Sequence, residues 1–340
     1  MMEGPAYDAL LLLSFGGPEG AADVLPFLQN VLRGRNLPAE RLREVAHHYE
    51  LFGGRSPIND QNRALLAALA TQFEQHGPRL PLYWGNRNWH PFLADTLKRM
   101  AEAGVRRALA FVTSAFSSYS GCRQYLEDIE RAREALGAGA PQVEKLRVYY
   151  DHPGFIEANA DRVRQAFDTL EQPRRGAARL AFTAHSIPVA MAESSEYEAQ
   201  LREACRLVAE AAGCGDWQLA FQSRSGPASQ PWLEPDIVEQ LRRLAAAGAR
   251  DVVVAPIGFV SDHMEVVYDL DTEAAAAARD LGIRMVRAGT PGTHPAFVAM
   301  IRELVLERTA GAARRALGRR PSPPEACPPD CCPRGGPPSR

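Results

Sequence analysis

The sequence has no long hydrophobic run and no recognisable targeting segment. Its longest early apolar stretch, Leu10–Leu13, falls far short of the ~18 residues that a membrane helix needs. The first residues, Met1 to Tyr7, lack both the basic start and the small-residue cleavage site of a secretory signal. We therefore expect a cytoplasmic protein without stable membrane insertion.

An excess of charge is also absent. The 340 residues carry a formal net charge of −2, which offers no attraction for a polyanion, so nucleic acid is not an expected partner. Apolar residues make up 46% and charged residues 24% of the chain, as in an ordinary globular protein with a hydrophobic core. The length suits two domains or one large α/β unit.

Short runs typical of buried strands alternate with amphipathic stretches typical of helices. This alternation predicts parallel sheets that are covered by helices on both faces. The expected strands are Ala9–Ser14, Leu80–Gly85, Ala108–Thr113, Lys145–Tyr149, Leu180–Ala184, Gln218–Gln222, Asp251–Ile257 and Ile283–Val286. The main expected helices are Asn62–Gln75, His90–Ala103, Gln124–Leu136, Pro153–Leu170, Tyr197–Ala212 and Asp236–Ala247.

The strands fall into two sets of four, separated by the polar, basic stretch Glu171–Arg179. We predict an α/β protein with two Rossmann-like domains, residues 1–170 and 171–293. A C-terminal helix within 294–313 is expected to pack back on the first domain. The Pro- and Cys-rich tail, 314–340, is expected to be extended unless a metal holds it.

Unusual residues follow the strands of both halves, where open parallel sheets bind their ligands. They include Phe15, Arg87, His185, Ser223 and the segment 259–265. Their convergence predicts one cleft between the two domains. The fingerprint G-x-G-x-x-G does not follow the first strand, which argues against a dinucleotide enzyme.

Two features of the second half carry possible chemistry. His185 follows a buried strand; it either satisfies local backbone groups or presents an imidazole that accepts a proton or binds a divalent metal. Glu265, Asp269 and Glu273 are spaced i, i+4 and i+8, which places them on one face of a helix. They form either a solvated helix face or a file that carries protons or a hydrated cation. Like charges at this spacing destabilise a helix, which favours a functional file.

Five sequence pieces resemble the motifs of the ferrochelatase family, in the family's order, from about Tyr7 to about Glu307. They are Leu12-Leu13-Ser14-Phe15-Gly16-Gly17-Pro18, Gly53-Gly54-Arg55-Ser56-Pro57-Ile58, Thr183-Ala184-His185-Ser186-Ile187-Pro188, Phe221-Gln222-Ser223-Arg224-Ser225-Gly226-Pro227 with Trp232-Leu233-Glu234-Pro235, and Gly258-Phe259-Val260-Ser261-Asp262-His263-Met264-Glu265. The resemblance implies an enzyme that inserts Fe(II) into a porphyrin in haem synthesis and releases two pyrrole protons. It also implies a porphyrin cleft between the domains.

The resemblance assigns roles to individual residues. His185 and Glu265 match the family's catalytic pair, and with Asp269 and Glu273 they are the expected metal-binding groups. The acidic file of the family lies on a widened, π-type helix, and Asp262 and His263 match residues that orient it. Expected substrate contacts are Phe15, Arg33, Arg35, Ser56, Arg87, Tyr125 and His263. Many bacterial members carry Tyr in the position of Phe15, and Phe cannot ligate the product iron.

A basic segment indicates which porphyrin is bound. Residues Leu28–Arg43 contain Arg33, Arg35, Arg41 and Arg43, and arginine binds carboxylates bidentately. Coproporphyrin III carries four propionates and protoporphyrin IX two, so we favour coproporphyrin III as substrate and coprohaem as product. An ordinary basic surface helix is the alternative. The macrocycle is expected to rest against Phe15, Trp84, Trp89 or Phe259, although core packing explains any single aromatic residue equally well.

Three of the six cysteines, Cys327, Cys331 and Cys332, crowd the polar C-terminal tail. Some ferrochelatases hold a [2Fe–2S] cluster with three C-terminal cysteines and one internal cysteine, so these three resemble cluster ligands. Four thiolates are the usual complement. One branch of the family has its fourth ligand near Ala158, where this chain has no cysteine; Cys122, Cys205 and Cys214 are candidates, or small buried residues. The alternative is a disordered tail with reactive thiols.

Other functions stay open at this point. They are a protoporphyrin IX ferrochelatase, a chelatase that inserts cobalt or nickel into another tetrapyrrole, and a non-catalytic haem carrier. A carrier would need the cleft but neither His185 nor the acidic file, which favours an enzyme. Coproporphyrin III and ferrous iron are the expected small-molecule partners, and other haem-pathway enzymes are possible protein partners.

Overall fold

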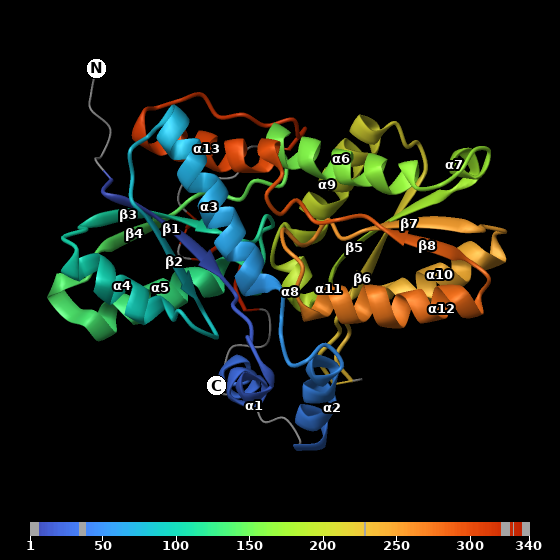
Figure 1. The fold of residues 1–340 in the computed structure, drawn as a ribbon, viewed down its shortest axis with the longest axis horizontal. Helices are drawn as coiled ribbons and strands as arrows, with labels where there is room; N and C mark the ends of the chain where they lie inside the picture. Colours follow the sequence, from blue (N-terminus) through green and yellow to red (C-terminus); the bar gives the residue numbers. More distant parts are fainter. Residues whose placement is uncertain (1–6, 34–38, 228, 321–326, 329, 335–340) are drawn as a thin grey trace.

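The computed structural model describes residues 7–33, 39–227, 229–320, 327–328 and 330–334, without the side chains of residues 39 and 41. This part of the chain contains two four-stranded parallel sheets that lie side by side, each covered by helices on both faces (Figure 1). The predicted α/β fold is therefore confirmed. No helix among the described residues is long and apolar enough to cross a membrane.

The first sheet has the strand order β2-β1-β3-β4. Its strands are β1 (Ala9–Ser14), β2 (Leu82–Asn86), β3 (Arg107–Val112) and β4 (Gln142–Lys145). In β1, Leu10 and Leu12 join the hydrophobic core on one face, and Leu11 and Leu13 join the core on the other. Successive side chains of a strand point to opposite faces, so a leucine run that is buried on both faces suits the centre of a parallel sheet.

The helices of the first half are α1 (Ala21–Val31), α2 (Ala39–Glu50), α3 (Ile58–His76), α4 (Leu93–Glu102), α5 (Gln124–Leu136) and α6 (Pro153–Asp168). A π-helical turn, η1 (Tyr119–Arg123), leads into α5, and a 3-10 turn, η2 (Gly137–Gly139), follows it. Helices α1 and α2 project from the two-sheet body at the bottom of Figure 1.

The second sheet repeats the arrangement, with the strand order β6-β5-β7-β8. Its strands are β5 (Arg179–His185), β6 (Trp217–Gln222), β7 (Asp251–Ala255) and β8 (Arg284–Arg287). Its helices are α7 (Arg174–Ala177), α8 (Val189–Glu193), α9 (Tyr197–Ala212), α10 (Ile237–Ala246), α11 (Met264–Tyr268) and α12 (Ala275–Asp280), with the π-helical turn η3 (Asp269–Ala274) between the last two.

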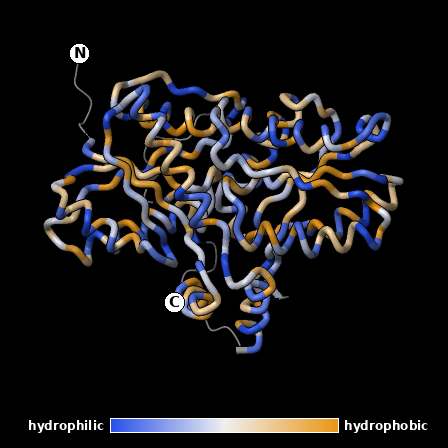
Figure 2. The backbone as a smooth tube through the Cα atoms, in the orientation of Figure 1, coloured by the Kyte–Doolittle hydropathy of each residue, from blue (hydrophilic) through white to orange (hydrophobic). Residues whose placement is uncertain are grey.

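One hydrophobic core joins the two halves. Leu12 of β1, Phe182 of β5 and Phe297 of the final helix α13 (Pro295–Thr309) belong to the same buried cluster. Helix α13 packs on α3 and α6, and α6 also packs on α9 and β7. A domain boundary at residue 170 remains a prediction, since the helix before it contacts both halves. Figure 2 shows hydrophobic residues concentrated along the strands of both sheets.

The fourth predicted strand was misplaced. The sequence predicts Lys145–Tyr149, but β4 ends at Lys145 and its strand pairing begins at Gln142. The apolar residues Leu146, Val148 and Tyr149 lie buried in the core that joins the two sheets. Their hydrophobicity reflects packing after the strand, which periodicity alone cannot separate from a buried strand.

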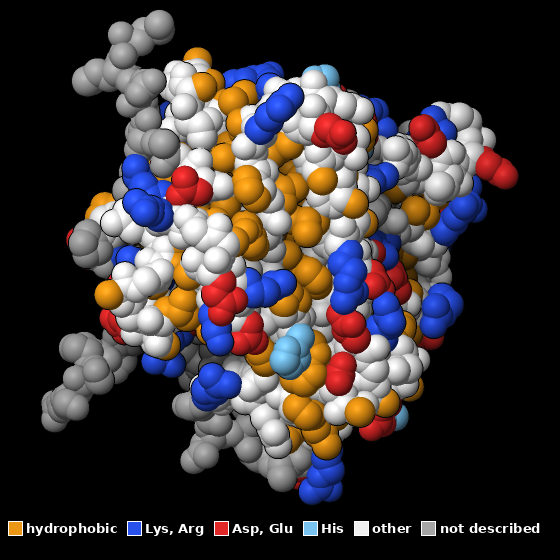
Figure 3. All heavy atoms as spheres, turned by 60° about the vertical axis from the view of Figure 1, so that its left-hand side comes forward, with side chains coloured by type: hydrophobic (Ala, Val, Ile, Leu, Met, Phe, Trp, Pro, Cys, Tyr) orange, Lys and Arg blue, Asp and Glu red, His pale blue; other side chains and the backbone are white. Residues whose placement is uncertain are grey.

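The outer surface is mixed in character. Figure 3 shows one face on which hydrophobic side chains are interspersed with charged groups of both signs. A groove of about 710 Å³ lies between α3 and residues 78–82 and contains none of the predicted site residues.

Candidate active site

Each sheet has a switch point, at which the chain stops adding strands on one side of a central strand and adds the next ones on its other side. In the first sheet β1 lies between β2 and β3, and in the second β5 lies between β6 and β7. Open parallel sheets bind ligands beyond the carboxyl ends of the strands at such a point. Phe15 directly follows β1, and His185 is the last residue of β5. The topology therefore places both residues where a ligand is expected.

His185 and Glu265 form the central pair of the second half. Glu265 lies in the first turn of α11, and its Oε1 atom is 3.5 Å from Nε2 of His185. The two side chains are 31% and 45% exposed, so a ligand can reach both. The Nδ1 atom of His185 contacts the Ser186 carbonyl, and the Tyr197 hydroxyl donates a hydrogen bond of 2.9 Å to the His185 carbonyl.

The pKa values of this pair move apart. Burial disfavours the charged imidazolium, but the Glu265 carboxylate outweighs burial and raises the pKa of His185 to about 9. Burial alone would raise the pKa of Glu265, but His185 and then His263 lower it to about 2. At neutral pH the pair is therefore an ion pair, and His185 carries a proton.

His263 holds the first turn of α11 as its N-cap. Its Nδ1 atom accepts a hydrogen bond of 3.2 Å from the Glu265 amide, which requires this nitrogen to be unprotonated. Burial lowers the pKa of His263 and so favours the neutral ring. From the other side, the Gln222 amide donates to the Glu265 carbonyl. The backbone that carries Glu265 is thus held by two side chains.

Asp262 anchors the loop that precedes α11. Its carboxylate accepts hydrogen bonds of 3.2 and 3.3 Å from Arg287 and one of 3.2 Å from the Thr290 hydroxyl. Its amide donates a hydrogen bond of 2.8 Å to the side chain of Gln61 in α3. Arg287 also bonds Asp271 in η3 at 2.6 Å. One arginine therefore ties the loop before α11 to the turn η3.

The acidic file continues from α11 into a widened helix. Asp269 and Glu273 lie in the π-helical turn η3, as the family resemblance implied. Burial raises the pKa of Asp269 to about 7; the Ser223 hydroxyl opposes this shift, while the charges of Glu265 and Glu273 add to it. Asp269 can therefore take up and release a proton near neutral pH.

In the part of the chain that the structure describes, no three His, Cys, Asp or Glu side chains are arranged to enclose a metal ion. The assignment of His185, Glu265, Asp269 and Glu273 as iron-binding groups therefore stays a prediction.

The first half contributes an aromatic cluster around Phe27 of α1. Phe15 and Trp89 both pack against Phe27 of α1, with ring centroids 6.2 and 6.3 Å apart. In α2, Tyr49 also contacts Phe27, and the charges of Glu265 and Asp269 add to the effect of burial in raising its pKa. Sequence reasoning missed Tyr49, because nothing in the pattern of α2 shows that it faces the acids of the other half.

A ring stack connects α2 directly to α11. His48 lies parallel to Tyr268, with ring centroids 3.7 Å apart and an interplanar angle of 11°. This contact joins the projecting α1–α2 unit to the helix that begins the acidic file. No sequence signal indicated this pairing.

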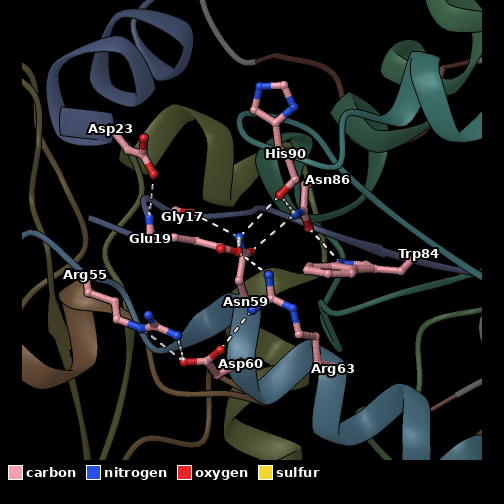
Figure 4. Close-up of polar contacts among 10 residues, drawn as sticks. All are labelled: Gly17, Glu19, Asp23, Arg55, Asn59, Asp60, Arg63, Trp84, Asn86 and His90. Atoms are coloured by element: carbon pink, nitrogen blue, oxygen red, sulfur yellow. Dashed lines mark hydrogen bonds and ion pairs between the residues drawn. The ribbon is translucent and has the colours of Figure 1, made fainter. Parts of the chain in front are cut away.

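A hydrogen-bonded network braces the loops that carry Phe15 and Trp89 (Figure 4). Asn59 of α3 donates to the carbonyls of Gly17 and His90, at 3.1 and 3.3 Å. Asn86 donates to the Asn59 side chain at 3.2 Å and to the His90 carbonyl at 3.0 Å. Gly16 has φ +82°, and a Cβ there would lie 2.8 Å from Cβ of Asn86. Only glycine fits this turn, which keeps the loop close to β2.

Three expected substrate contacts are buried against other protein groups in this structure. The Arg87 side chain is only 8% exposed, pairs with Asp128 and stands 4.5 Å above the Tyr125 ring. Tyr125 is itself buried, and Ser56 is buried against the backbone of Gly17. The Arg87 guanidinium also stands 6.0 Å from the centroid of the Phe15 ring. Direct contact of these three residues with a substrate stays a prediction.

The predicted basic lip is only partly described. Arg33 and Arg43 are exposed, and Arg33 bonds the Asn30 side chain at 2.8 Å. Arg35 and the side chain of Arg41 lie outside the described residues. Of the other aromatic candidates, Phe259 is buried beside His263, and Trp84 bonds Asn86.

The tail cysteines lie close to one internal cysteine. The Sγ atoms of Cys122 and Cys327 are 3.9 Å apart, and those of Cys331 and Cys332 are 3.3 Å apart. All six cysteines are free thiols. Cys205, buried in α9, and Cys214, which follows α9, contact none of these four sulfurs in the described structure.

Comparison with known proteins identifies close relatives. The family model described as ferrochelatase matches residues 7–309. The chain is 57% identical to a ferrochelatase of Rhodopirellula baltica, over 98% of this chain and 95% of the relative. It is 54% identical to a coproporphyrin III ferrochelatase of Nocardia farcinica, over 93% of this chain and 92% of the relative. A coproporphyrin III ferrochelatase of Streptomyces coelicolor is 51% identical, over 99% and 96%.

Solved structures share the fold at low sequence identity. SirB from Bacillus subtilis, solved with Fe3+, superposes with a TM-score of 0.56 at 11% identity, covering 89% of this chain and 97% of SirB. DR2241 from Deinococcus radiodurans, a multi-domain protein with structural similarity to chelatases, superposes with a TM-score of 0.54 at 16% identity. That match covers 91% of this chain and 56% of DR2241. These likenesses concern the fold alone.

Proposed function

Because this chain belongs to the ferrochelatase family, we propose that it inserts Fe(II) into coproporphyrin III. The products are coprohaem and two protons, which leave the two pyrrole N–H groups. The observation that carries the proposal is the 3.5 Å ion pair of His185 and Glu265 at the carboxyl end of β5, where the second sheet has its switch point. Relatives at 50–54% identity that are named coproporphyrin III ferrochelatase support this choice of substrate.

The resting ion pair constrains the order of events. With a pKa of about 9, His185 is protonated at neutral pH and cannot accept a pyrrole proton. An incoming Fe(II) ion that is drawn to Glu265 neutralises the charge that holds this proton. The pKa of His185 then falls, because its burial acts without the opposing carboxylate. His185 releases its proton and becomes a neutral base beside the porphyrin.

The acidic file provides the exit for protons. Asp269, with a pKa of about 7, exchanges a proton near neutral pH and lies one helical turn beyond Glu265. Glu273 lies in the same widened turn η3 and continues the file. In this role the file accepts pyrrole protons that reach His185 or Glu265, and it attracts the divalent ion by its charge.

The aromatic cluster of the first half supplies the other wall of the cleft. Phe15, Trp89 and Tyr49 offer ring faces and edges on which an aromatic macrocycle can pack. Binding at the periphery can offset the cost of bending the ring, which exposes the nitrogen lone pairs. Arg33 and Arg43 on the exposed lip offer cations to propionates.

Anaerobic turnover with Fe(II) tests this function. The wild-type protein, His185→Ala and Glu265→Gln are compared with coproporphyrin III and with protoporphyrin IX, and porphyrin binding is measured separately by fluorescence. We expect both variants to bind porphyrin but to insert iron about 10²- to 10⁴-fold more slowly, the usual contribution of a general acid–base group. Glu239→Gln, an exposed glutamate in α10 paired with Arg243, is the matched control. Near wild-type insertion by either variant, or preference for protoporphyrin IX, contradicts the corresponding part of the proposal.

Two further assignments belong to the same proposal. A cytoplasmic location agrees with a tetra-anionic substrate, and the helices of the described residues offer no membrane span. The tail cysteines Cys327, Cys331 and Cys332 are proposed as ligands of a [2Fe–2S] cluster. Their thiols lie close to one another and to Cys122, and an all-cysteine donor set suits such a cluster.

A further inference from the structure

The loops that follow the first two strands of the first sheet run side by side. The Arg87 amide donates a hydrogen bond of 3.0 Å to the Ser14 carbonyl, and the Asn88 amide donates one of 3.1 Å to the Phe15 carbonyl. The Asn88 side chain bonds the same Phe15 carbonyl at 3.3 Å. The backbone therefore brings Arg87, which follows β2, next to Phe15, which follows β1.

The Arg87 guanidinium lies over two aromatic rings from different segments. Its central carbon is 4.5 Å from the centroid of the Tyr125 ring in α5 and 6.0 Å from that of the Phe15 ring. A guanidinium within about 6 Å of a ring centroid is attracted to the face of the ring. Burial raises the pKa of Tyr125, and the charge of Arg87 opposes that rise. Arg87 thus joins α5 to the residue that follows β1.

Asp128 holds this guanidinium from the next turn of α5. Its carboxylate forms an ion pair with Nε of Arg87, and the side chains of Asp128 and Arg87 are 17% and 8% exposed. Asp128 stands three residues after Tyr125, so both lie on one face of the helix. Asp128 also pairs with Arg131, whose side chain is 65% exposed. Only Arg87 is buried, and a buried cation is costly unless an anion pairs with it.

The Phe15 ring is the end of this chain of contacts that a ligand can reach, because it is partly exposed. It packs against Phe27 of α1, with ring centroids 6.2 Å apart, and Phe27 in turn contacts Trp89. These rings belong to the aromatic cluster on which the proposed function places the macrocycle. Phe15 therefore has two supports, which are Phe27 and the guanidinium of Arg87 that Asp128 holds.

An unpaired arginine at this place would have another use. Arginine binds carboxylates bidentately, which is why Arg87 was an expected contact for propionates. A propionate that bound Arg87 would have to displace Asp128 from an ion pair that is largely shielded from solvent. Arg33 and Arg43 are exposed and can bind propionates without such a displacement. The ion pair thus favours a supporting role for Arg87 over a direct contact with substrate.

We propose that Asp128 is a positioning residue for iron insertion, which neutralises Arg87, withholds it from substrate carboxylates and so fixes the Phe15 ring against the macrocycle. This rests on the proposed function and adds the group that sets one of its aromatic contacts. Asp128 touches neither porphyrin nor iron and acts only through Arg87. Loss of its charge should therefore slow iron insertion without weakening porphyrin binding.

The first test compares Asp128→Asn with the wild type in anaerobic iron insertion and, by fluorescence, in porphyrin binding. The amide keeps the shape of the carboxylate but not its charge. We expect kcat to fall about tenfold, because a displaced ring moves the macrocycle relative to the reacting groups, while the Kd for coproporphyrin III does not rise. An unchanged kcat, or a Kd that rises as kcat falls, contradicts the proposal.

A matched control comes from the same helix. Glu130 lies two residues after Asp128 and pairs with Arg133, and its side chain is 58% exposed. Glu130→Gln removes a carboxylate by the same chemistry as Asp128→Asn, but from an ion pair that solvent already screens. We expect Glu130→Gln to leave both kcat and Kd unchanged. A loss of kcat in Glu130→Gln equal to that in Asp128→Asn would contradict a specific role for Asp128.

A double variant shows whether Asp128 acts through Arg87. Arg87→Met keeps an unbranched side chain beside Phe15 and removes the charge that Asp128 holds. We expect kcat of the variant that combines Asp128→Asn and Arg87→Met to be no lower than that of the slower single variant, because the effects of residues in one network are not additive. Losses that multiply would show that the two residues act independently and would overturn the proposal.

The hold on Arg87 is measured without iron insertion by the reaction of arginines with phenylglyoxal. Modified arginines of the intact protein are located by mass spectrometry, with and without coproporphyrin III. In the wild type we expect the exposed Arg33 to react and Arg87 to stay unmodified in both samples, whereas Arg87 should react in Asp128→Asn. If Asp128→Asn does not fold, the wild type alone decides. An Arg87 that reacts in the free protein is not held, and one that the porphyrin then protects is a propionate ligand; either result refutes the proposal.

The two proposals fail in different ways. If the positioning role is wrong, the wild type still inserts iron, His185→Ala and Glu265→Gln are still slow, and Asp128→Asn behaves like Glu130→Gln. If iron insertion is not the function, the wild type metallates neither porphyrin, and the positioning role fails with it even where Arg87 is protected from phenylglyoxal.

Discussion

Replacement of Glu265 by Gln should lower the pKa of His185. In the wild-type protein the carboxylate raises the pKa of His185 from 6.5 to about 9, against the opposing effect of burial. The amide of Gln has nearly the same shape but no charge, so burial is then opposed only by the Ser186 carbonyl and the charge of Asp269. We expect the pKa of His185 to fall by one unit or more in Glu265→Gln.

The size of the effect follows from the geometry. Each pKa unit corresponds to about 1.4 kcal/mol, so a net rise from 6.5 to about 9 corresponds to about 3.5 kcal/mol before solvent screening is considered. The two side chains are 31% and 45% exposed, and solvent screens such pairs. A coupling of about 1–2 kcal/mol, which is a fall of the pKa by about one unit or more, is the realistic expectation.

Nuclear magnetic resonance of protein labelled in its histidine rings measures this directly. The eight histidines are titrated in the absence of substrate, and the His185 signal is assigned by its loss in His185→Gln. Glu239→Gln serves as the control that removes an exposed carboxylate elsewhere. A wild-type His185 that titrates near 6.5, or a pKa that is equal in wild type and Glu265→Gln, refutes the ion pair and the order of events derived from it.

The stability of the fold should depend on pH through the same two pKa shifts. The pKa of His185 is raised, so its contribution is complete below 6.5 and is lost as the pH rises through about 9. The pKa of Glu265 is lowered, so its contribution is present above 4.5 and is lost as the pH falls through about 2. The difference in melting temperature between wild type and Glu265→Gln should therefore be largest between pH 4.5 and 6.5 and should shrink towards pH 9.

Three further predictions concern neighbouring residues. Asp269, with a pKa of about 7, acts as a base only when ionised, so the rate of iron insertion by the wild type should fall below pH 7. Asp269→Asn should insert iron at least about tenfold more slowly and should lose this fall in rate at low pH. An unchanged pH profile in the variant would exclude the proton relay. His263→Ala should lower the free energy of unfolding by about 1 kcal/mol because the N-cap is lost, whereas His263→Asn should keep most of that stability. Urea unfolding measures both variants, and an equal loss of stability in the two would argue against capping. Replacing Arg33 and Arg43 together by Ala should raise the KM several-fold for coproporphyrin III and little for protoporphyrin IX. An equal change of KM for both porphyrins would show that these arginines do not recognise the additional propionates.

The sequence located most strands because their signal is local. The leucine run of β1 is buried on both faces, and its bounds agree with the predicted Ala9–Ser14. The prediction of the fourth strand was wrong because its signal is not local. The apolar residues after Lys145 are buried by packing in the core between the sheets and not by strand pairing. A buried run shows that residues lie inside, but it does not show which surface covers them.

The candidate site was predictable where neighbours in sequence share one helix or one strand end. The spacing of Glu265, Asp269 and Glu273 predicted one file, which continues from α11 into η3. The same reasoning could not show that Arg87 is buried and pairs with Asp128. A basic residue at a strand end is available to a ligand only if no closer carboxylate neutralises it, and that depends on α5.

By itself, the sequence determined the strand–helix alternation, the position of His185 at the end of a buried strand, and the acidic file, because each is a property of a short segment. It also determined the family, because the motifs occur in the family's order. Only the tertiary structure decided which distant groups meet: His185 with Glu265, His48 with Tyr268, and Cys122 with Cys327. Strand order and the crossing of the tail bring these pairs within a few ångströms, and the pKa of a buried imidazole or the ligand set of a cluster depends on contacts at that range.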